Sequence, residues 1–301
     1  MNLNKLKGTG VALVTPFHKD GSIDFKSFQR LINRCIDGKV EFLVPLGTTG
    51  ESATLSLNEK RALTDFIIEI VDKRLPIVLG LGGNNTQEIL TLIEEQDFNG
   101  IDAVLSVSPY YNRPSQRGIF QHYKMIANEC PVPVIIYNVP SRTGSNIDAD
   151  TTLQLANEVI NVVGIKEASG NMEKAMKIIK NKPKDFLVIS GDDMLTLPIM
   201  SCGGDGVISV IANAFPKDFS EMVRLCLAGS FDKARKLHYK LHDITHAIYV
   251  DGNPSGIKGL LASLNICSEF VRLPLTCVNK YLKKLIDPLF LKDCHPHKLH
   301  V

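Results

Sequence analysis

The sequence lacks the features that mark several large protein classes. Its 34 basic and 32 acidic side chains leave a net charge of only +2, with no long block of like charge. That balance argues against the clustered basic surface of proteins that bind nucleic acids or anionic membranes. No apolar run is long enough to span a bilayer, and the first residues, Met1 to Lys7, lack the apolar core of a secretory signal. We therefore expect a cytoplasmic protein with no nucleic-acid and no membrane partner.

The seven cysteines lack a motif. Their number is odd and no Cys-x-x-Cys occurs, which favours reduced, partly buried thiols in a cytosolic protein. Cys294 begins a histidine-rich stretch that ends at His300 and resembles a set of metal ligands. Ligands so close together at a chain terminus make a poor metal cage, because termini fray. We expect no metal site.

Apolar runs alternate with amphipathic segments over the first three quarters of the chain. Eight runs are nearly continuous in apolar residues, as in parallel strands that are covered on both faces: residues 10–14, 42–46, 77–81, 103–107, 134–137, 162–165, 186–190 and 206–210. Segments with helical periodicity accompany them, at residues 25–37, 58–72, 86–96, 115–128, 150–157, 171–180, 194–200 and 216–227. The spacing between strands suits βαβ units.

Eight such units predict a closed (β/α)8 TIM barrel. A doubly wound open sheet is the alternative, but its Gly-x-Gly-x-x-Gly fingerprint does not follow any strand. After Gly229 the strand-like runs stop, and helices are expected at residues 231–245, 255–264 and 275–289. We therefore predict a barrel domain over residues 1–229 and a small C-terminal helical appendage over residues 230–301.

Four of the predicted strands end in loops that are rich in functional groups. Catalytic residues of such barrels come from the C-terminal ends of the strands, so these loops would meet on one face. In chain order they are Gly47-Thr48-Thr49-Gly50-Glu51-Ser52, Ser108-Pro109-Tyr110-Tyr111-Asn112-Arg113-Pro114, Tyr137-Asn138-Val139-Pro140-Ser141-Arg142-Thr143-Gly144, and the loop that begins at Lys166.

Lys166 ends an apolar strand, where an ammonium must be paired or lose its proton. A neutral lysine is a nucleophile for carbonyl substrates, although most lysines at strand ends are solvated or salt-bridged. The hydroxyls and backbone N–H groups at Thr48 and Thr49 suit an anion cradle, although Gly and Thr are also common in plain turns. Taken alone, Tyr137 fits core packing and Arg142 fits a solvated side chain.

Considered together, these residues have a chemical logic. Hydroxyls beside a lysine nucleophile can relay the protons that imine and enamine chemistry requires. An arginine and an anion cradle bind carboxylates. The adjacent Tyr110 and Tyr111, on a proline-flanked loop, indicate a binding or subunit surface. The set predicts a Schiff-base lyase or aldolase that acts on a 2-oxo acid.

At these loops the sequence resembles the dihydrodipicolinate synthase / N-acetylneuraminate lyase family. Gly-Thr-Thr-Gly-Glu, Pro-Tyr-Tyr-Asn-Arg-Pro, Tyr-Asn-Val-Pro-Ser-Arg-Thr-Gly and Gly-Ile-Lys-Glu-Ala-Ser-Gly occur together and in order. The resemblance runs from Gly10 to Pro254 and fades in the tail after Leu289. Any one motif would be modest support, whereas the four together are highly specific.

The resemblance implies a substrate pair and the residues that hold it. Lys166 would form an imine with pyruvate, and Thr48 and Thr49 would hold the pyruvate carboxylate. The backbone at Ile208 would line the same pocket. Arg142 would bind the carboxylate of the second substrate, L-aspartate 4-semialdehyde. No organic cofactor is implied.

The resemblance also implies a proton relay that depends on assembly. Tyr137 would donate and accept protons, and it would form the relay with Thr48 and with Tyr111 from a neighbouring subunit. The implied assembly is a homotetramer built as a dimer of dimers. A sugar-acid or sialic acid aldolase of the same family is the nearest alternative, and a small-molecule-binding barrel without turnover is a remote one. The context of Arg142 and the Tyr110-Tyr111 pair favour the synthase members.

One departure from the family pattern concerns feedback inhibition. Members that bind lysine at the dimer interface often carry histidines where Leu57 and Lys60 stand here, although Asn84, Glu88 and Tyr110 match. Lys60 would place a cation near the ammonium of the effector. We predict weak or absent inhibition by L-lysine.

Overall fold

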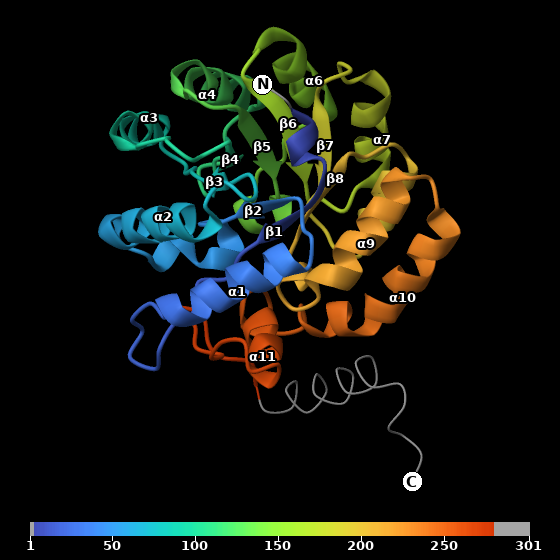
Figure 1. Ribbon diagram of the computed structural model, residues 1–301. Coiled ribbons are helices and arrows are strands. Elements are labelled where there is room, and N and C mark those ends of the chain that lie inside the picture. The colour runs from blue at the N-terminus through green and yellow to red at the C-terminus, as the bar shows by residue number, and fades with distance from the viewer. Residues whose placement is uncertain (1–2, 280–301) are drawn as a thin grey trace.

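The computed structural model describes residues 3–279, in which eight parallel strands form a barrel surrounded by helices (Figure 1). Neighbouring strands are hydrogen-bonded in the order β2-β1-β8-β7-β6-β5-β4-β3. An isolated parallel bridge between Leu43 and Ile77 joins β2 to the segment before β3 and nearly closes the sheet. The predicted (β/α)8 barrel is confirmed. The strands are β1 Gly8–Ala12, β2 Phe42–Val44, β3 Val78–Gly80, β4 Ala103–Val107, β5 Val134–Asn138, β6 Val162–Glu167, β7 Leu187–Ser190 and β8 Gly206–Ser209.

Most helices of the barrel begin where the sequence carries a capping residue. Asp24, Ser56 and Ser115 each accept a hydrogen bond from a backbone N–H of the first turn. Helices α1 to α4 are Phe25–Asp37, Leu57–Val71, Thr86–Glu95 and Gln116–Glu129, and α6 to α9 are Ala149–Glu158, Met172–Asn181, Thr196–Ser201 and Pro216–Leu227. A further single turn, α5 Pro140–Thr143, was not predicted and follows β5 directly.

The first strand is displaced from its predicted position. It covers Gly8–Ala12 rather than residues 10–14, because Gly8 pairs with Gly206 of β8 and the backbone N–H of Val14 bonds to the side chain of Asn213. A Cβ on Gly206 would lie 2.2 Å from the carbonyl oxygen of Gly8. The pairing therefore requires glycine, a residue that apolar periodicity does not favour in a strand.

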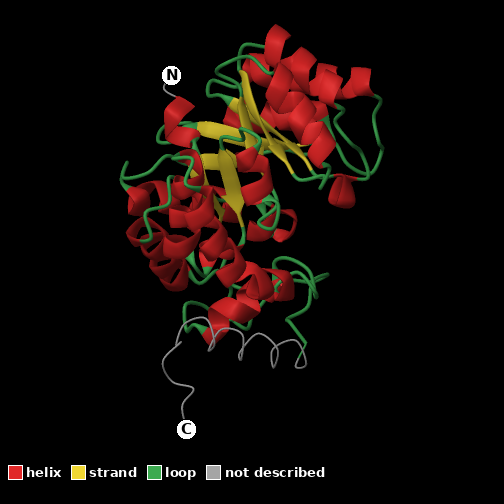
Figure 2. Cartoon of the chain, turned by 90° about the vertical axis from the view of Figure 1, so that its right-hand side faces the viewer, coloured by secondary structure: helices red, strands yellow, loops and turns green. Residues whose placement is uncertain are grey.

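Two further helices follow the barrel, α10 Phe231–Ala247 and α11 Ser255–Ser263. Figure 1 shows α10 beside α9 and α11 below α1. Figure 2, turned by 90°, shows the strands of the barrel surrounded by helices. The predicted helix from Leu275 is wrong over residues 275–279, and the rest of that range lies outside the described residues. The carbonyl of Thr276 accepts from the Ser255 hydroxyl and the N–H of Asn279 donates to Asp251, so this segment is bonded to the chain around α11.

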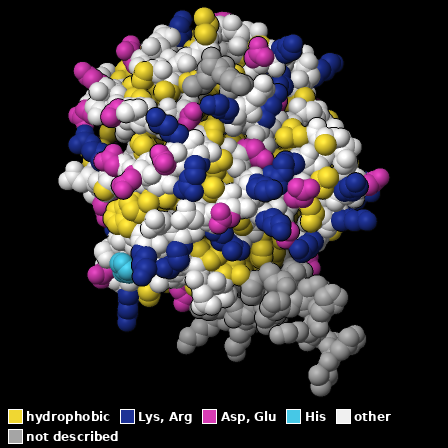
Figure 3. All heavy atoms as spheres, viewed as in Figure 1, with side chains coloured by type: hydrophobic (Ala, Val, Ile, Leu, Met, Phe, Trp, Pro, Cys, Tyr) yellow, Lys and Arg dark blue, Asp and Glu magenta, His cyan; other side chains and the backbone are white. Residues whose placement is uncertain are grey.

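The apolar core continues from the barrel into the C-terminal helices. Val11 of β1, Leu241 of α10 and Ile257 of α11 belong to one cluster of buried side chains. Gly229 lies in the turn between α9 and α10, and the core is not interrupted there. On the face shown in Figure 3, basic and acidic side chains are interspersed. Among residues 3–279, no helix is long and apolar enough to cross a membrane.

Candidate active site

A cavity of about 440 Å³ opens at the C-terminal ends of the strands. Three of the four loops singled out in the sequence contribute to it, with Thr48 and Thr49 after β2, Tyr137 and Arg142 at and after β5, and Lys166 on β6. Two regions that were not singled out also line it. They are the loop after β7, with Asp192, and the chain between α10 and α11, with Tyr249 and Asn253.

Lys166 and Tyr137 lie side by side on the cavity wall. They are register partners on the adjacent strands β6 and β5, so their side chains leave the sheet on the same side. The Nζ atom of Lys166 is 4.3 Å from the centre of the Tyr137 ring. Both side chains are almost fully buried, at 5% and 7% exposure. Within the described part of the chain, Lys166 has no carboxylate within ion-pair distance.

The surroundings of Lys166 lower the pKa of its amine. Burial lowers its pKa from 10.5 to about 7, with a further lowering by the positive charge of Arg142 and an opposing effect from the carboxylate of Asp193. A lysine with a pKa near neutrality is partly unprotonated at physiological pH, and the free amine attacks carbonyl carbons. Burial and the nearby charge of Arg142 therefore favour the unprotonated form of Lys166.

Tyr137 is held as a neutral phenol. Burial raises its pKa, while Arg142 and a hydrogen bond with the Thr48 side chain partly oppose that rise. A protonated hydroxyl that is bonded to a second hydroxyl can pass a proton along the pair. The hydrogen bond between Thr48 and Tyr137 brings together two of the residues that the sequence analysis expects in the relay.

The turn after β2, which the sequence analysis expects to hold a carboxylate, is bonded to a residue from the C-terminal part of the chain. Thr49 lies in a short 3-10 turn, Thr48–Gly50, and its side chain is buried. The Asn253 amide Nδ2 donates to the Thr49 hydroxyl oxygen at 2.9 Å. Because this hydroxyl oxygen already accepts a bond, its own hydrogen is left to donate toward the cavity.

Arg142 sits on the rim of the cavity, on α5. Pro140 begins this turn and Gly144 ends it in a left-handed conformation with φ of 67°. The Nη2 atom of Arg142 donates to the backbone carbonyl of Asn253 at 3.2 Å. The guanidinium therefore lines the opening, where a substrate carboxylate would pass or bind.

Two predicted residues do not join the cavity of their own chain. Tyr111 is 90% exposed, with a positive φ of 71°, and it is not among the residues that line the cavity. Its backbone N–H donates to the carbonyl of Thr143, which fixes its loop beside α5. Ile208 is buried in β8, and the cavity wall nearby is formed by Val210 instead.

Asp193 is a buried carboxylate that acts electrostatically on Lys166 and that the sequence analysis did not single out. Its carboxylate accepts from the backbone N–H groups of Val210 and Ile211 and from the Tyr249 hydroxyl at 3.2 Å. Burial raises the pKa of Asp193, and its charge acts on Lys166. The signal for it was available, since Gly191-Asp192-Asp193 directly follows a predicted strand.

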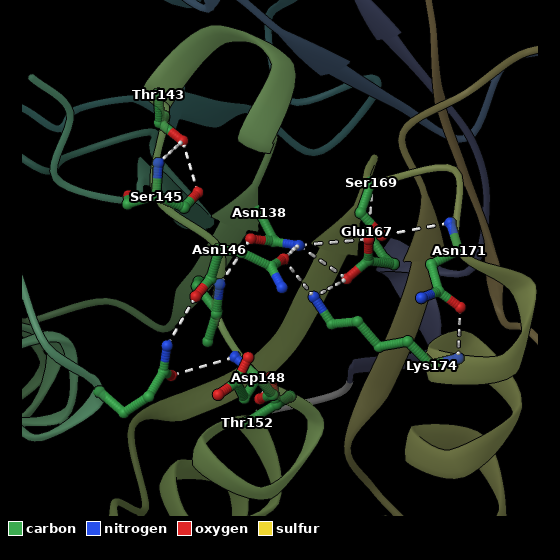
Figure 4. Close-up of polar contacts among 12 residues, drawn as sticks. Asn138, Thr143, Ser145, Asn146, Asp148, Thr152, Glu167, Ser169, Asn171 and Lys174 are labelled. Carbon is green, nitrogen blue, oxygen red and sulfur yellow. Dashed lines mark hydrogen bonds and ion pairs between the residues drawn. The ribbon is translucent and has the colours of Figure 1, made fainter. Parts of the chain in front are cut away.

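The outer faces of β5 and β6 carry a polar cluster (Figure 4). Asn138 and Glu167 follow Tyr137 and Lys166 in register and face the helices. The Glu167 carboxylate pairs with Lys174 of α7 at 3.0 Å, with the two side chains 2% and 8% exposed. The Glu167 carboxylate also accepts hydrogen bonds from Asn138 Nδ2 at 3.1 Å and from the backbone N–H of Ser169 at 2.7 Å.

Asn146 extends this cluster to the loop after β5. Its Oδ1 accepts from both Lys174 and Asn138, each at 3.0 Å. The side chain of Asn138 in turn accepts from the backbone N–H of Ile147 at 2.8 Å. These bonds join the ends of β5 and β6 to each other and to α7, which fixes the strand positions that carry Tyr137 and Lys166.

Comparison with known proteins places this chain in a family. Residues 5–288 match the family model described as the dihydrodipicolinate synthetase family. A 4-hydroxy-tetrahydrodipicolinate synthase from Flavobacterium psychrophilum is 55% identical over 95% of this chain and 97% of its own length.

Solved structures of dihydrodipicolinate synthases are similar to this chain over nearly its whole length. The dihydrodipicolinate synthase of Aquifex aeolicus superposes with a TM-score of 0.93 at 39% identity, covering 97% of this chain and 99% of that chain. A protein described as the first monomeric dihydrodipicolinate synthase variant gives the same TM-score at 36% identity, over 96% and 97% of the two chains. The chain belongs to the dihydrodipicolinate synthetase family.

Proposed function

We propose that this protein condenses pyruvate with L-aspartate 4-semialdehyde, the reaction of a 4-hydroxy-tetrahydrodipicolinate synthase, in the diaminopimelate route to lysine. The observation that carries the proposal is a buried lysine, with a pKa of about 7 and Tyr137 beside it, on the wall of a cavity of about 440 Å³. The high identity to the Flavobacterium psychrophilum synthase supports the choice of substrates.

In the first step the neutral amine of Lys166 attacks the C2 carbonyl of pyruvate. The carbonyl oxygen takes up protons and leaves as water, so that an imine joins Nζ to C2. Thr49 and Thr48 hold the pyruvate carboxylate through their hydroxyls, which fixes the carbonyl beside the lysine. Tyr137 supplies and removes the protons that this step requires.

In the second step the imine loses a proton from C3 and becomes an enamine. The enamine carbon attacks the aldehyde carbon of the second substrate, and the resulting alkoxide takes a proton from the relay. Arg142 on the rim binds the carboxylate of that substrate. The amine of the same substrate then attacks C2, closes the ring and releases Lys166 as the free amine.

The relay is proposed to be completed by Tyr111 of a second subunit. Tyr111 does not line the cavity of its own chain, and it is exposed on a loop next to the turn that carries Arg142. Large exposed aromatics are typical of interfaces. We infer a homotetramer built as a dimer of dimers, in which Tyr111, Thr48 and Tyr137 share the proton transfer.

The state of the cysteine thiols is relevant to the cellular compartment in which the protein works. The described cysteines at positions 35, 130, 202, 226, 267 and 277 are all free. Free thiols persist where the environment is reducing. This supports the proposal that the protein works in the cytoplasm.

Borohydride reduction in the presence of pyruvate tests the proposal directly. Reduction traps an imine as a stable secondary amine, which peptide mass spectrometry assigns to one lysine. We expect the adduct on Lys166 alone and none on the buried Lys174 or Lys258. An adduct on another lysine, or none at saturating pyruvate, would contradict the mechanism.

A paired activity assay tests the choice of reaction. We expect condensation of pyruvate with L-aspartate 4-semialdehyde and no cleavage of sialic acid or related sugar acids. Cleavage of a sugar acid without the condensation would assign the site to an aldolase of the same family.

A further inference from the structure

The loop that forms the carboxylate cradle is held in place by a buried charge at its end. Glu51 directly follows Thr48, Thr49 and Gly50 and adopts a left-handed conformation, with φ of 54° and ψ of 36°. L-residues other than glycine, asparagine and aspartate rarely adopt this conformation, so other contacts must hold it. The carboxylate of Glu51 is the group that makes those contacts.

Both oxygens of the Glu51 carboxylate bond to the C-terminal part of the chain. Oε1 pairs with Nζ of Lys258, on α11, at 2.5 Å, and both side chains are 0% exposed. Oε2 accepts from the backbone N–H of Arg272 at 2.9 Å. The glutamate that ends the cradle is therefore anchored by residues more than two hundred positions away in the sequence.

Lys258 is itself fixed from several sides. Its Nζ donates to the carbonyl of Phe270 at 2.8 Å and lies 4.1 Å from the centre of the Phe17 ring. The guanidinium of Arg272 lies 4.5 Å from the same ring, and it pairs with Glu59 of α2. A buried ion pair that also bonds to the backbone on both sides restricts the position of the loop that carries its carboxylate.

A second connection reaches the same cradle from the same part of the chain. Asn253, two residues before α11 begins, donates to the Thr49 hydroxyl. On the other side of the loop, the Thr15 hydroxyl donates to the Gly50 carbonyl at 2.7 Å. The cradle is thus fixed at Thr49, Gly50 and Glu51, and two of these three anchors come from beyond the barrel strands.

We propose that Lys258, through its buried pair with Glu51, is a positioning residue for the pyruvate carboxylate. The C-terminal helical segment then completes the first substrate site rather than only covering the barrel. This inference rests on the proposed binding of pyruvate at Thr48 and Thr49. In this proposal Lys258 affects the affinity for pyruvate. The chemical steps remain with Lys166 and Tyr137.

Replacing the lysine tests this role. In Lys258→Met the cation is lost and the Glu51 carboxylate stays buried, so the loop must shift to rehydrate it. We expect the KM for pyruvate to rise about tenfold, the effect of losing one charge-assisted hydrogen bond at the cradle. The kcat and the KM for the semialdehyde should change little. Lys240→Met, which removes the exposed pair with Asp218 in the same segment, is the control and should leave all three constants unchanged.

A double variant separates positioning from folding. Glu51→Gln combined with Lys258→Met removes both charges, which relieves the uncompensated charge and restores the melting temperature toward that of the natural protein. The pyruvate KM should nevertheless stay raised, because the loop has lost its anchor. Recovery of KM together with Tm would show that Lys258 acts only on stability and would overturn the proposal.

Imine trapping distinguishes failure of this inference from failure of the proposed function. The concentration of pyruvate that gives half-maximal borohydride adduct on Lys166 is measured for the natural protein and for the double variant. We expect an adduct in both, with a higher half-saturating concentration in the variant. Equal half-saturation would contradict the role of Lys258, whereas no adduct in either protein would contradict the proposed function.

Discussion

Lys166 and Lys174 are two buried lysines on opposite sides of the strand β6. They differ in whether a carboxylate pairs with them. Lys166 faces the cavity without an ion-pair partner among the described residues, and burial lowers its pKa to about 7. Lys174 reaches the outer face of β6, where the Glu167 carboxylate pairs with it at 3.0 Å. Burial alone therefore does not make a lysine reactive. The two lysines differ in their partners, because Glu167 pairs with Lys174 and no described carboxylate pairs with Lys166.

The largest effect should come from Lys166 itself. Lys166→Arg replaces the amine that forms the imine with a guanidinium, which is not a nucleophile, so kcat should fall by at least about a thousandfold. The variant should also give no borohydride adduct with pyruvate. Lys177→Arg, on the exposed side of α7, is the matched control. Activity within tenfold of the natural protein would show that another lysine carries the chemistry.

Tyr111→Phe should have the next largest effect. Removing one hydroxyl from a proton relay lowers kcat by about a hundredfold, the range of general acid–base catalysis. The control is Tyr239→Phe, which changes a tyrosine that is 65% exposed on α10. Unchanged activity of Tyr111→Phe would contradict its place in the relay.

Mixing inactive subunits tests whether Tyr111 crosses between them. Lys166→Arg retains Tyr111, and Tyr111→Phe retains Lys166. If the tyrosine serves the site of the neighbouring subunit, mixed dimers contain a complete site and regain activity. Co-expressed chains that stay inactive, although they form dimers by sedimentation, would show that the tyrosine does not serve the neighbouring site.

Lys174→Met should affect stability more than chemistry. It leaves the Glu167 carboxylate buried with only the Asn138 and Ser169 donors, so the free energy of unfolding should fall by about 3 kcal/mol. The pyruvate adduct on Lys166 should persist in the folded variant. Lys177→Met breaks an exposed pair with Asp150 on the same helix and should cost less than about 0.5 kcal/mol. Urea unfolding measures both, and loss of the adduct from folded Lys174→Met would contradict the division between the two lysines.

The smallest effect concerns feedback. Leu57 and Lys60 line a small pocket that reaches Thr48 and Tyr137. Because the Lys60 cation would repel the ammonium of an effector, L-lysine at sub-millimolar concentration should leave the initial rate unchanged. Lys60→Ala removes that charge and should increase any inhibition. Clear inhibition of the natural protein would contradict this prediction.

The parts of the fold that follow local patterns were predicted from the sequence. Each strand is a short apolar run and each helix has its own periodicity, so the order of the barrel follows from neighbours in the chain. The start of β1 was predicted wrongly, because the close contact of Gly8 with Gly206 depends on a residue far along the chain. The helix expected from Leu275 was wrong over residues 275–279, where bonds to Ser255 and Asp251 hold the backbone.

The site residues show the same difference between features with a local sequence pattern and features that depend on distant contacts. The rule for strand ends and the family motifs found five residues that the structure places around one cavity. They lie at the C-terminal end of a strand or in the segment that follows it: Thr48, Thr49, Tyr137, Arg142 and Lys166. The roles of Asn253 and Lys258 were not predicted, because they depend on contacts with Thr49 and Glu51 across most of the chain length. The neighbours of a charged or amide side chain in the sequence do not show which distant residue it contacts in the fold.

Titration of Lys166 in the folded protein tests the central claim most directly. Lysine isotope-labelled at Cε reports protonation of each amine by NMR, and the Lys166 resonance is the one missing from Lys166→Arg. The account predicts a midpoint of about 7, set by burial without a carboxylate partner. A midpoint near 10.5, the ordinary value, would show that Lys166 is a charged lysine at neutral pH and would contradict the account.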